Sequence, residues 1–597
     1  MPMNPRLRYL ALASALVLAI FAQTASAAGD FYLKNGDRVV FYGDSITDQR
    51  LYTTFAETFV ITRFPATQVT FTHSGWGGDR VTGGGGGPIA QRLEHDVFAY
   101  KPTVVTIMLG MNDGSYQAFN QGIFNSYSQG YTSIVEKLQT TVPGIRLTLI
   151  RPSPFDDVTR EPKFPGGYNA VLVGYGDFVK KLAEQNHQIS ADFNTAVVSV
   201  LTKAKATDAE LSAKIIPDRV HPGPSGHLIM AGTLLKSWNA PALVTEVEID
   251  AAGKRVTRAT ATTVTALKIE NALVWTQLDE ALPMPVNLAD PVTALAIKSS
   301  DFIETLDQQP LRVTGLTAPA YTLKIDDQIV GTWSKEDFAK GINLAVQHTP
   351  MTDQASAVHT LTLQHTGMHQ ARWRTYQLGL KDAKTDAVKT ALAQLLKALD
   401  AEEDVVIAQQ RAAAQPVARS YELTPQTSVP APAPAASVSS AAPDAPLPGV
   451  TGPNLALNKT YVCSDPNVSQ WAVGLTDGSW KGEKGTTFAT GMQDTFPKTV
   501  TIDLTKSSVI SQVQAGVPSF GSTKTVAVSI STDGQAFTEV GRYAFTLGQQ
   551  EKHAFPFSPA EARYVRLTYL DHHNEESGYP VSYMFTSDVQ VYGPSAK

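Results

Sequence analysis

The chain of 597 residues contains a single cysteine, Cys463, so an intrachain disulfide is impossible. It also lacks an excess of positive charge: 49 Lys and Arg stand against 55 Asp and Glu, for a formal net charge of -6. With no basic stripe, the composition argues against nucleic acid as the partner. A chain of this length without bridges must rely on large hydrophobic cores, and ~150 residues per domain predicts three or four folded units.

A membrane-spanning run is also missing. Arg6 and Arg8 precede an uncharged stretch from Tyr9 to Ala22, and Ala25-Ser26-Ala27 follows. The stretch is short for a membrane span, which needs ~20 residues, whereas the charges and the small residues are typical of a secretory signal peptide. We therefore predict a signal peptide over residues 1–28 and an exported protein, periplasmic or extracellular, without a span after cleavage. An uncleaved anchor is the alternative.

Motifs for metal or nucleotide chemistry are absent as well. The sequence has no His-Glu-x-x-His and no cysteine pair, and the five glycines at 83–87 lack the Gly-Lys-Ser/Thr ending of a phosphate loop. No cofactor is expected, and a metal site is not identified. The glycine run instead predicts a mobile loop.

Residues 29–240 alternate short apolar runs with polar or helical stretches. The runs predict strands at residues 39–42, 69–72, 104–109, 147–150 and 189–192. Strands alternating with helices predict an α/β fold with a parallel sheet, in which reactive groups gather at the carboxyl ends of the strands.

Residues suited to acyl transfer stand at those strand ends. Ser45, in Gly43-Asp44-Ser45-Ile46-Thr47, follows the first strand, and an N-cap role is its alternative reading. His221 is the candidate base, and Asp218 is placed to orient it. The backbone N–H groups of Ser45 and Gly78 and the side-chain amide of Asn112 are candidate donors to an oxyanion.

These blocks, in this order, resemble the GDSL/SGNH hydrolase family over residues 38–240. The resemblance implies a three-layer α/β serine esterase in which Ser45, Asp218 and His221 form the triad and Gly78 and Asn112 complete the oxyanion hole. His73 stands where many relatives have Asn, so the hydrogen bonding of that loop is open. His73 and, beyond the triad, His227 are interpreted as structural. The loop 151–157 should edge the pocket, either as a substrate contact or as a structural loop.

Downstream of Pro241 the pattern changes to alternation, which predicts a small antiparallel β domain, a sandwich, over 241–333. Residues 334–411 read as helical, starting at the capping-box sequence Ser334-Lys-Glu-Asp337. Five apolar residues share one helix face, which predicts packing, with a lid as the alternative: Val388, Leu392, Leu395, Leu396 and Leu399. Residues 412–452, rich in Ala, Pro and Ser, predict a disordered linker.

Residues 453–597 return to short alternating runs, which predict a β-sandwich. The blocks Asn454-Leu-Ala-Leu-Asn-Lys, Asp477-Gly-Ser-Trp480, Ser531-Thr-Asp-Gly-Gln-Ala-Phe537 and Ala562-Arg-Tyr-Val-Arg-Leu567 resemble the discoidin-like, coagulation-factor type C domain. That resemblance implies a fold more than a ligand: relatives bind glycans or lipids, and some hold a calcium ion whose ligands are not identified in this sequence. Five residues fit either a sugar platform or the core: Trp471, Trp480, His572, His573 and Tyr579.

Together these features predict an exported serine esterase that removes O-acetyl groups from a polysaccharide, with a tethered carbohydrate-binding module. Two alternatives remain at this point: a lipase-like or arylesterase-like hydrolase of small esters, and a non-catalytic glycan-binding surface protein. All triad and oxyanion positions are filled, which favours an enzyme. The oligomeric state is not set by any of these patterns.

Overall fold

The computed structural model describes residues 30–428 and 452–594, except 289, 327, 468–470, 472, 484, 492–495 and 574–578. The predicted signal peptide and most of the predicted linker lie outside these residues. The chain divides into two compact units, Met1–Pro430 and Ala431–Lys597. Each is described by itself.

The first unit is built on a five-stranded parallel sheet of order β2-β1-β5-β6-β7. Each of its strands overlaps one of the runs predicted from the sequence, and the sheet interior is apolar, as a sheet covered on both faces requires. The strands are β1 (Arg38–Gly43), β2 (Thr70–Gly75), β5 (Val104–Met108), β6 (Arg146–Arg151) and β7 (Ile189–Asp192).

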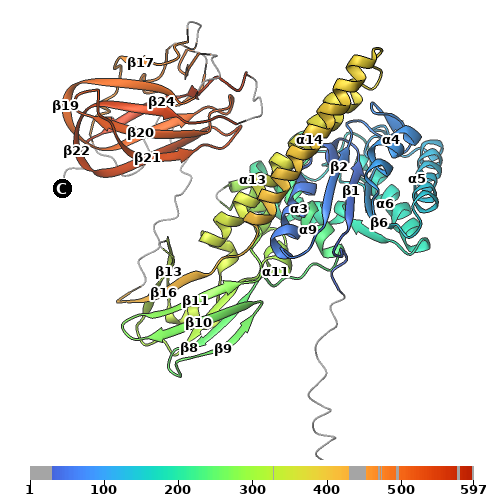
Figure 1. Cartoon of the computed structure of the whole chain (residues 1–597), viewed down its shortest axis with the longest axis horizontal. Helices are drawn as coiled ribbons and strands as arrows, with labels where there is room; N and C mark the ends of the chain where they lie inside the picture. Colours follow the sequence, from blue (N-terminus) through green and yellow to red (C-terminus); the bar gives the residue numbers. More distant parts are fainter. Residues whose placement is uncertain are drawn as a thin grey trace, which may run out of the picture. The chain divides into compact units, whose positions relative to one another are not determined.

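Helices cover both faces of this sheet (Figure 1). Helices α3 (Leu51–Arg63) and α9 (Pro224–Ser237) pack against each other on one side, and α5 (Gln121–Thr141) and α6 (Gly167–Gln185) lie on the other. The predicted α/β three-layer architecture is confirmed. The remaining elements of this region are short or peripheral: α2 (Ser45–Asp48), β3 (Gly83–Gly84), β4 (Gly87–Pro88), α4 (Ile89–Asp96), η1 (Phe98–Tyr100), α7 (Phe193–Thr207) and α8 (Ala209–Ser212).

The glycine run 83–87 forms the β3–β4 hairpin and packs against Trp76. A Cβ atom on Gly86 would lie 2.8 Å from a ring carbon of Trp76, and one on Gly85 would lie 2.9 Å from the ring nitrogen. The glycines therefore serve close packing, which the sequence interpretation, a mobile loop, did not include.

A β-rich region follows, in two sheets of order β10-β11-β16-β13-β14 and β15-β12-β8-β9. The strands β13 and β14 form an antiparallel hairpin, but the expectation of an antiparallel domain is wrong in one place, since β12 pairs with β8 in parallel. Its strands and one short helix are β8 (Glu246–Asp250), β9 (Arg255–Thr260), β10 (Thr262–Ile269), β11 (Leu273–Asp279), β12 (Pro310–Thr314), β13 (Ala320–Ile325), β14 (Gln328–Ser334), α12 (Lys335–Lys340), β15 (Ile342–Asn343) and β16 (Arg419–Gln426).

Two boundaries differ from the sequence interpretation. Strand β16 lies within the predicted linker, yet it pairs with β11 and β13 in the middle of a sheet and buries Tyr421 and Leu423 completely. Helices α10 (Pro291–Lys298) and α11 (Phe302–Leu306) interrupt the predicted β domain and pack on α9, so their apolar side chains join the core of the hydrolase region.

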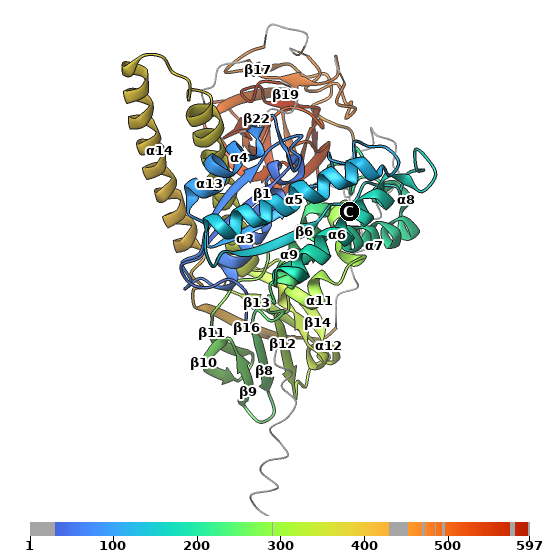
Figure 2. The ribbon, with the colours of Figure 1, turned by 90° about the vertical axis from the view of Figure 1, so that its right-hand side faces the viewer.

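A long helical hairpin lies between these strands in sequence (Figures 1 and 2). It consists of α13 (Pro350–Gln370), the π-helical segment Ala371–Leu378 and α14 (Asp386–Ala413). The helix start predicted at Ser334 is confirmed, since its hydroxyl caps α12 by accepting the Asp337 N–H at 3.1 Å and also donates to the Asp337 carboxylate at 2.6 Å. Helix α13 packs on α3, so the packing interpretation holds for it. The predicted apolar face of α14 is used only in part, because Val388 and Leu395 are exposed.

The second unit is a β-sandwich, as predicted. Its main sheet has the order β17-β19-β22-β20-β21, and β24 pairs with β19. Alternate residues of β19 and β22, among them Val500, Ile502, Val565 and Leu567, fill the core. The strands are β17 (Tyr461–Cys463), β18 (Phe488–Ala489), β19 (Lys498–Val517), β20 (Thr525–Ser531), β21 (Thr538–Ala544), β22 (Glu551–Tyr569), β23 (Phe585–Thr586) and β24 (Asp588–Tyr592).

Candidate active site

Ser45 is the first residue of α2, directly after β1. The side chain of Asp44 caps this helix by accepting the N–H of Ile46 at 3.0 Å, so Asp44 is the N-cap and the alternative reading of Ser45 as the cap is wrong. Gly43 is required at the turn because a Cβ atom there would lie 2.2 Å from the Thr47 hydroxyl oxygen. The Ser45 hydroxyl is thereby presented, half-buried, at the carboxyl edge of the sheet.

His221 and Asp218 meet Ser45 across 176 residues of chain. The Nε2 atom of His221 lies 2.9 Å from Ser45 Oγ, and its Nδ1 atom lies 2.6 Å from Asp218 Oδ2. Asp218 Oδ1 accepts the backbone N–H groups of His221 at 2.7 Å and Val220 at 2.9 Å. Burial alone would raise the pKa of Asp218, but these hydrogen bonds outweigh it and lower the pKa below its usual range. The carboxylate stays ionised and can orient the imidazole.

The candidate oxyanion donors come from the next two strand ends. Gly78 follows β2 with φ +78°, a left-handed conformation that favours glycine. The Asn112 side chain follows β5, accepts the Tyr116 hydroxyl at 3.1 Å, and donates one N–H to the Asp79 carbonyl at 3.1 Å. An amide nitrogen carries two hydrogens, so the second remains for an oxyanion. The sequence interpretation missed Tyr116, because a lone tyrosine in a loop carries no motif.

The two histidines interpreted as structural are buried and bonded. The Nδ1 atom of His227 accepts the Tyr52 N–H at 3.2 Å, and its Nε2 atom donates to the Gln49 side-chain oxygen at 3.0 Å. Burial lowers the pKa of His227 to about 3. His73 bonds Thr53 at 2.7 Å and Glu57 at 2.8 Å. The open question about His73 is answered: its ring joins β2 to α3.

Glu57 also anchors the helical hairpin. It accepts from His365 of α13 at 3.0 Å, and the other nitrogen of His365 bonds Glu403 of α14 at 3.0 Å. Burial alone would lower the pKa of His365, but Glu57 and Glu403 raise it to about 10. A charged imidazole between two carboxylates thus holds the helical hairpin to α3.

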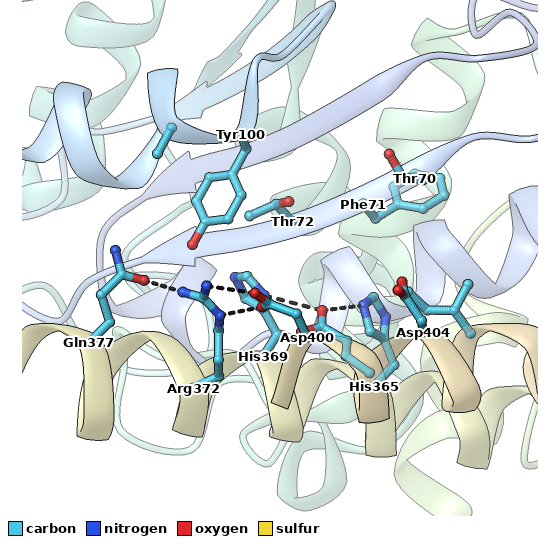
Figure 3. A pocket seen from close by; sticks show the side chains of 13 residues that line it. Thr70, Phe71, Thr72, Tyr100, His365, His369, Arg372, Gln377, Asp400 and Asp404 are labelled. Atoms are coloured by element: carbon cyan, nitrogen blue, oxygen red, sulfur yellow. Dashed lines mark hydrogen bonds and ion pairs between the residues drawn. The ribbon is translucent and has the colours of Figure 1, made fainter. Parts of the chain in front are cut away.

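Beside this network, a cavity of about 380 Å³ lies between β2 and the hairpin (Figure 3). Most of its charged groups pair with one another: Arg372 with Asp400 at 2.5 Å, and Glu403 with His365 at 3.0 Å and with His369 at 3.2 Å. The cavity is therefore part of the hairpin anchor. Ser45 and His221 do not line it.

The charged side chains of the loop 151–157 have partners within the fold. Arg151 pairs with Asp177 and Asp192, and the buried Asp156 accepts the backbone N–H of Thr159 at 2.8 Å. These charged groups are used within the fold, which favours the structural alternative.

Among the residues that the structure describes, no group of three or more His, Cys, Asp or Glu side chains is arranged to hold a metal ion. In the same part of the chain, no helix is long and apolar enough to cross a membrane.

In the second unit, the five residues of the possible sugar platform do not form one exposed surface. Trp480 is fully buried, and a Cβ atom on Gly516 would lie 2.7 Å from its ring. Trp471 is 6% exposed and packs edge-to-face on Tyr579 and Phe585. The His573 ring donates to the Phe545 carbonyl at 2.8 Å. Both tryptophans therefore take the core alternative.

Comparisons with known proteins match both units. Residues 41–229 match the model of the GDSL-like lipase/acylhydrolase family, and residues 474–567 match that of the NedA-like, galactose-binding domain. An acetylxylan esterase from Geobacillus stearothermophilus is 25% identical over 223 residues, 34% of this chain and 94% of that protein.

A solved structure of a gut microbial diltiazem-metabolizing enzyme aligns with a TM-score of 0.58 and 27% identity. The alignment covers 66% of this chain and 98% of that one. This span is longer than the α/β domain alone. With the family matches, it confirms the sequence interpretation: the chain is a multidomain carboxylic ester hydrolase that joins a GDSL-like lipase/acylhydrolase domain to a discoidin-like β-sandwich.

Proposed function

We propose that the protein removes O-acetyl groups from a polysaccharide, with Ser45 as the nucleophile. The observation that carries the chemistry is the unbroken series of contacts from Asp218 through His221 to Ser45 Oγ. The substrate class is supported by the acetylxylan esterase relative and by the match of the second unit to a galactose-binding domain.

In this mechanism neutral His221 accepts the Ser45 proton through Nε2 as Oγ attacks the ester carbonyl. The N–H groups of Ser45 and Gly78 and the free N–H of Asn112 bind the oxyanion of the tetrahedral intermediate. His221 then gives the proton to the leaving sugar oxygen, and acetyl remains on Ser45. A water molecule, activated by the same imidazole, releases acetate and restores the serine.

The exposure of the site supports a second candidate equally well, hydrolysis of small esters. The side chains of His221 and Asp218 are 35% and 54% exposed, so a small ester reaches the triad as readily as a polymer does. The two candidates share one mechanism and differ in what the substrate contacts beyond the acyl group.

Acetate release separates the candidates. Mature protein is incubated with acetylated xylan, de-acetylated xylan and 4-nitrophenyl acetate, and acetate is followed by proton NMR, with Ser45→Ala as control. We expect release from acetylated xylan with kcat/KM at least equal to that for the aryl ester, and none from the control. Turnover of the aryl ester alone would favour the small-ester candidate. Turnover by Ser45→Ala at the wild-type rate would refute the serine mechanism.

We also infer export, on the N-terminal sequence alone. Arg6, Arg8 and the uncharged stretch that follows support a signal peptide cleaved after Ala27 or Ala28. Expression of the full chain in a bacterial host, followed by N-terminal sequencing of the extracytoplasmic fraction, is expected to give a chain that begins at Ala28 or Gly29. A chain retained in the cytoplasm with Met1 intact would contradict it.

A further inference from the structure

The π-helical segment Ala371–Leu378, although distant in sequence, contacts the loop of residues 75–79, which carries Gly78 and is called the oxyanion loop below. Its Arg374 guanidinium donates to the Gly75 carbonyl at 2.9 Å and pairs with the Asp48 carboxylate at 3.0 Å. The guanidinium carbon also lies 4.0 Å from the centre of the Trp76 ring. Gly75 and Trp76 immediately precede the turn that carries Gly78, so Arg374 touches the base of that turn.

Asp48 connects this contact to the nucleophile. It lies in α2, the helix that begins at Ser45, and its Oδ2 atom accepts the backbone N–H of Gly77 at 3.2 Å. The Asp48 carboxylate therefore binds both the Gly77 N–H of the loop and the Arg374 guanidinium. The Trp76 N–H also donates to the Gly43 carbonyl at 3.0 Å, which joins the start of the loop to the strand before Ser45. Because Ser45 and Asp48 share a single helical turn, the contacts of Asp48 add the side-chain link between that turn and the part of the loop next to Gly78.

A second connection runs through Trp373, the neighbour of Arg374. Its indole N–H donates to Asp96 at 2.6 Å, and Asp96 pairs with Arg92. Arg92 donates to the Asp79 carboxylate at 2.7 Å, and all three ionic side chains are fully buried. Since the Asp79 carbonyl accepts from Asn112, this path ends on the second candidate donor.

We propose that Arg374 is a positioning residue of the esterase: by holding Gly75 and Asp48, it fixes the Gly78 N–H at the place where the oxyanion forms over Ser45. The helical hairpin is then a working part of the active site. The inference rests on the proposed serine mechanism and adds a residue from outside the part of the chain that matches the hydrolase family.

Arg372 provides a matched control on the same segment. It pairs with Asp400 of α14 at 2.5 and 3.1 Å, so it connects the two arms of the hairpin. Its described hydrogen bonds and ion pairs do not reach the loop 75–79 or Asn112. Arg372→Met and Arg374→Met remove the same charge and keep a similar stem. Only the second removes a contact to the oxyanion loop.

The experiment measures kcat and KM of the full-length protein with 4-nitrophenyl acetate. We expect Arg374→Met to lower kcat about 10- to 100-fold with KM within about threefold, because a donor displaced by an ångström costs up to ~10²-fold. Arg374→Lys keeps a charged donor without the fork geometry, so its kcat should lie between that of the wild type and that of Arg374→Met. Arg372→Met should stay within about twofold of the wild type.

Inhibition by a phenylboronic acid gives a second readout. Boronates form a tetrahedral adduct with an active serine, so their inhibition constant reports the oxyanion hole without turnover. It should rise in Arg374→Met by the factor lost in kcat/KM. Equal kcat in Arg374→Met and the wild type, or equal losses in the Arg374→Met and Arg372→Met variants, would overturn the inference.

If Arg374→Met unfolds, Asp48→Asn takes its place as the test. It keeps the side-chain size, weakens the contacts to Arg374 and Gly77, and should lower kcat about tenfold; an unchanged kcat would refute the positioning role. A wild-type protein inactive on every ester would count against the proposed function instead. An active wild type with an equally active Arg374 variant counts against Arg374 alone.

Discussion

The two units of the chain use their polar and aromatic side chains in different ways. In the first, half-exposed polar groups converge at one edge of a parallel sheet, each held by directional contacts such as the 2.6 Å bond between His221 and Asp218. In the second, Trp471 and Trp480 turn inward and serve the core. A substitution among the polar groups at that sheet edge should therefore change a rate, whereas replacement of a buried tryptophan in the second unit should change stability.

The largest effect that tests this comparison is expected at His221. His221→Gln removes the base and should lower kcat/KM for 4-nitrophenyl acetate by roughly 10⁴-fold without changing the unfolding temperature, since triad members act as a unit. His227→Gln is the matched control, because His227 is buried, neutral and bonded to the Tyr52 backbone. It should lower the unfolding temperature and leave kcat within about threefold. The reverse pattern would exchange the roles of the two histidines.

The next effect belongs to the second unit. Trp480→Ala removes a fully buried ring that packs on Gly516, and should lower the free energy of unfolding of that unit by about 3–5 kcal/mol. Calorimetry of the full chain should show the loss in one transition only, and turnover of 4-nitrophenyl acetate should not change. If the variant has normal stability but fails to bind a galactose-containing polysaccharide, Trp480 serves sugar binding and the core interpretation is wrong.

A smaller, pH-dependent effect is expected at the hairpin anchor. The folded-state pKa of His365 is raised to about 10, above ~6.5 for an unfolded histidine, so its contribution is complete below pH ~6.5 and is lost as pH rises toward 10. The pKa of Glu403 is lowered to about 2, although its burial acts in the opposite direction, so its share is lost only in acid.

Thermal unfolding of the wild type and of His365→Gln measures this contribution. At pH 6 the variant should unfold several degrees lower, and the gap between the two proteins should narrow steadily up to pH 10. A gap that is constant across this range would mean that the charge of His365 contributes nothing and that only its shape matters.

How far the sequence predicts this molecule depends on where the partner of each residue lies. Ser45 could be assigned because it directly follows a predicted strand, and Asp218 and His221 because their spacing before a predicted helix completes the ordered motifs of the hydrolase family. Strand β16 could not be recognised, because Tyr421 and Leu423 stand beside a Pro- and Ala-rich stretch and their partners on β11 and β13 lie far upstream. Arg374 was missed for the same reason, since its contacts exist only after α13 docks on α3.

The smallest effect is expected where the two units are separated. A chain that ends at Gln426 keeps β16, whereas one that ends at Ala413 loses the strand between β11 and β13 and exposes their edges. The chain that ends at Ala413 should fail to fold its β-rich region. The chain that ends at Gln426 should keep kcat/KM for 4-nitrophenyl acetate within about twofold of the full chain, because a soluble ester gains nothing from a second binding domain.

On a polymeric substrate, the chain that ends at Gln426 should be less active than the full chain. If the second unit binds the polysaccharide that carries the acetyl groups, tethering raises the effective substrate concentration at Ser45 without a new contact to the ester. Acetate release from insoluble acetylated xylan should then fall severalfold, and the isolated unit should be retarded in an affinity gel that contains the polysaccharide. Equal loss on both substrates would show that the unit supports folding of the hydrolase. Unchanged acetate release from the polymer would show that the second unit does not contribute to hydrolysis of this substrate.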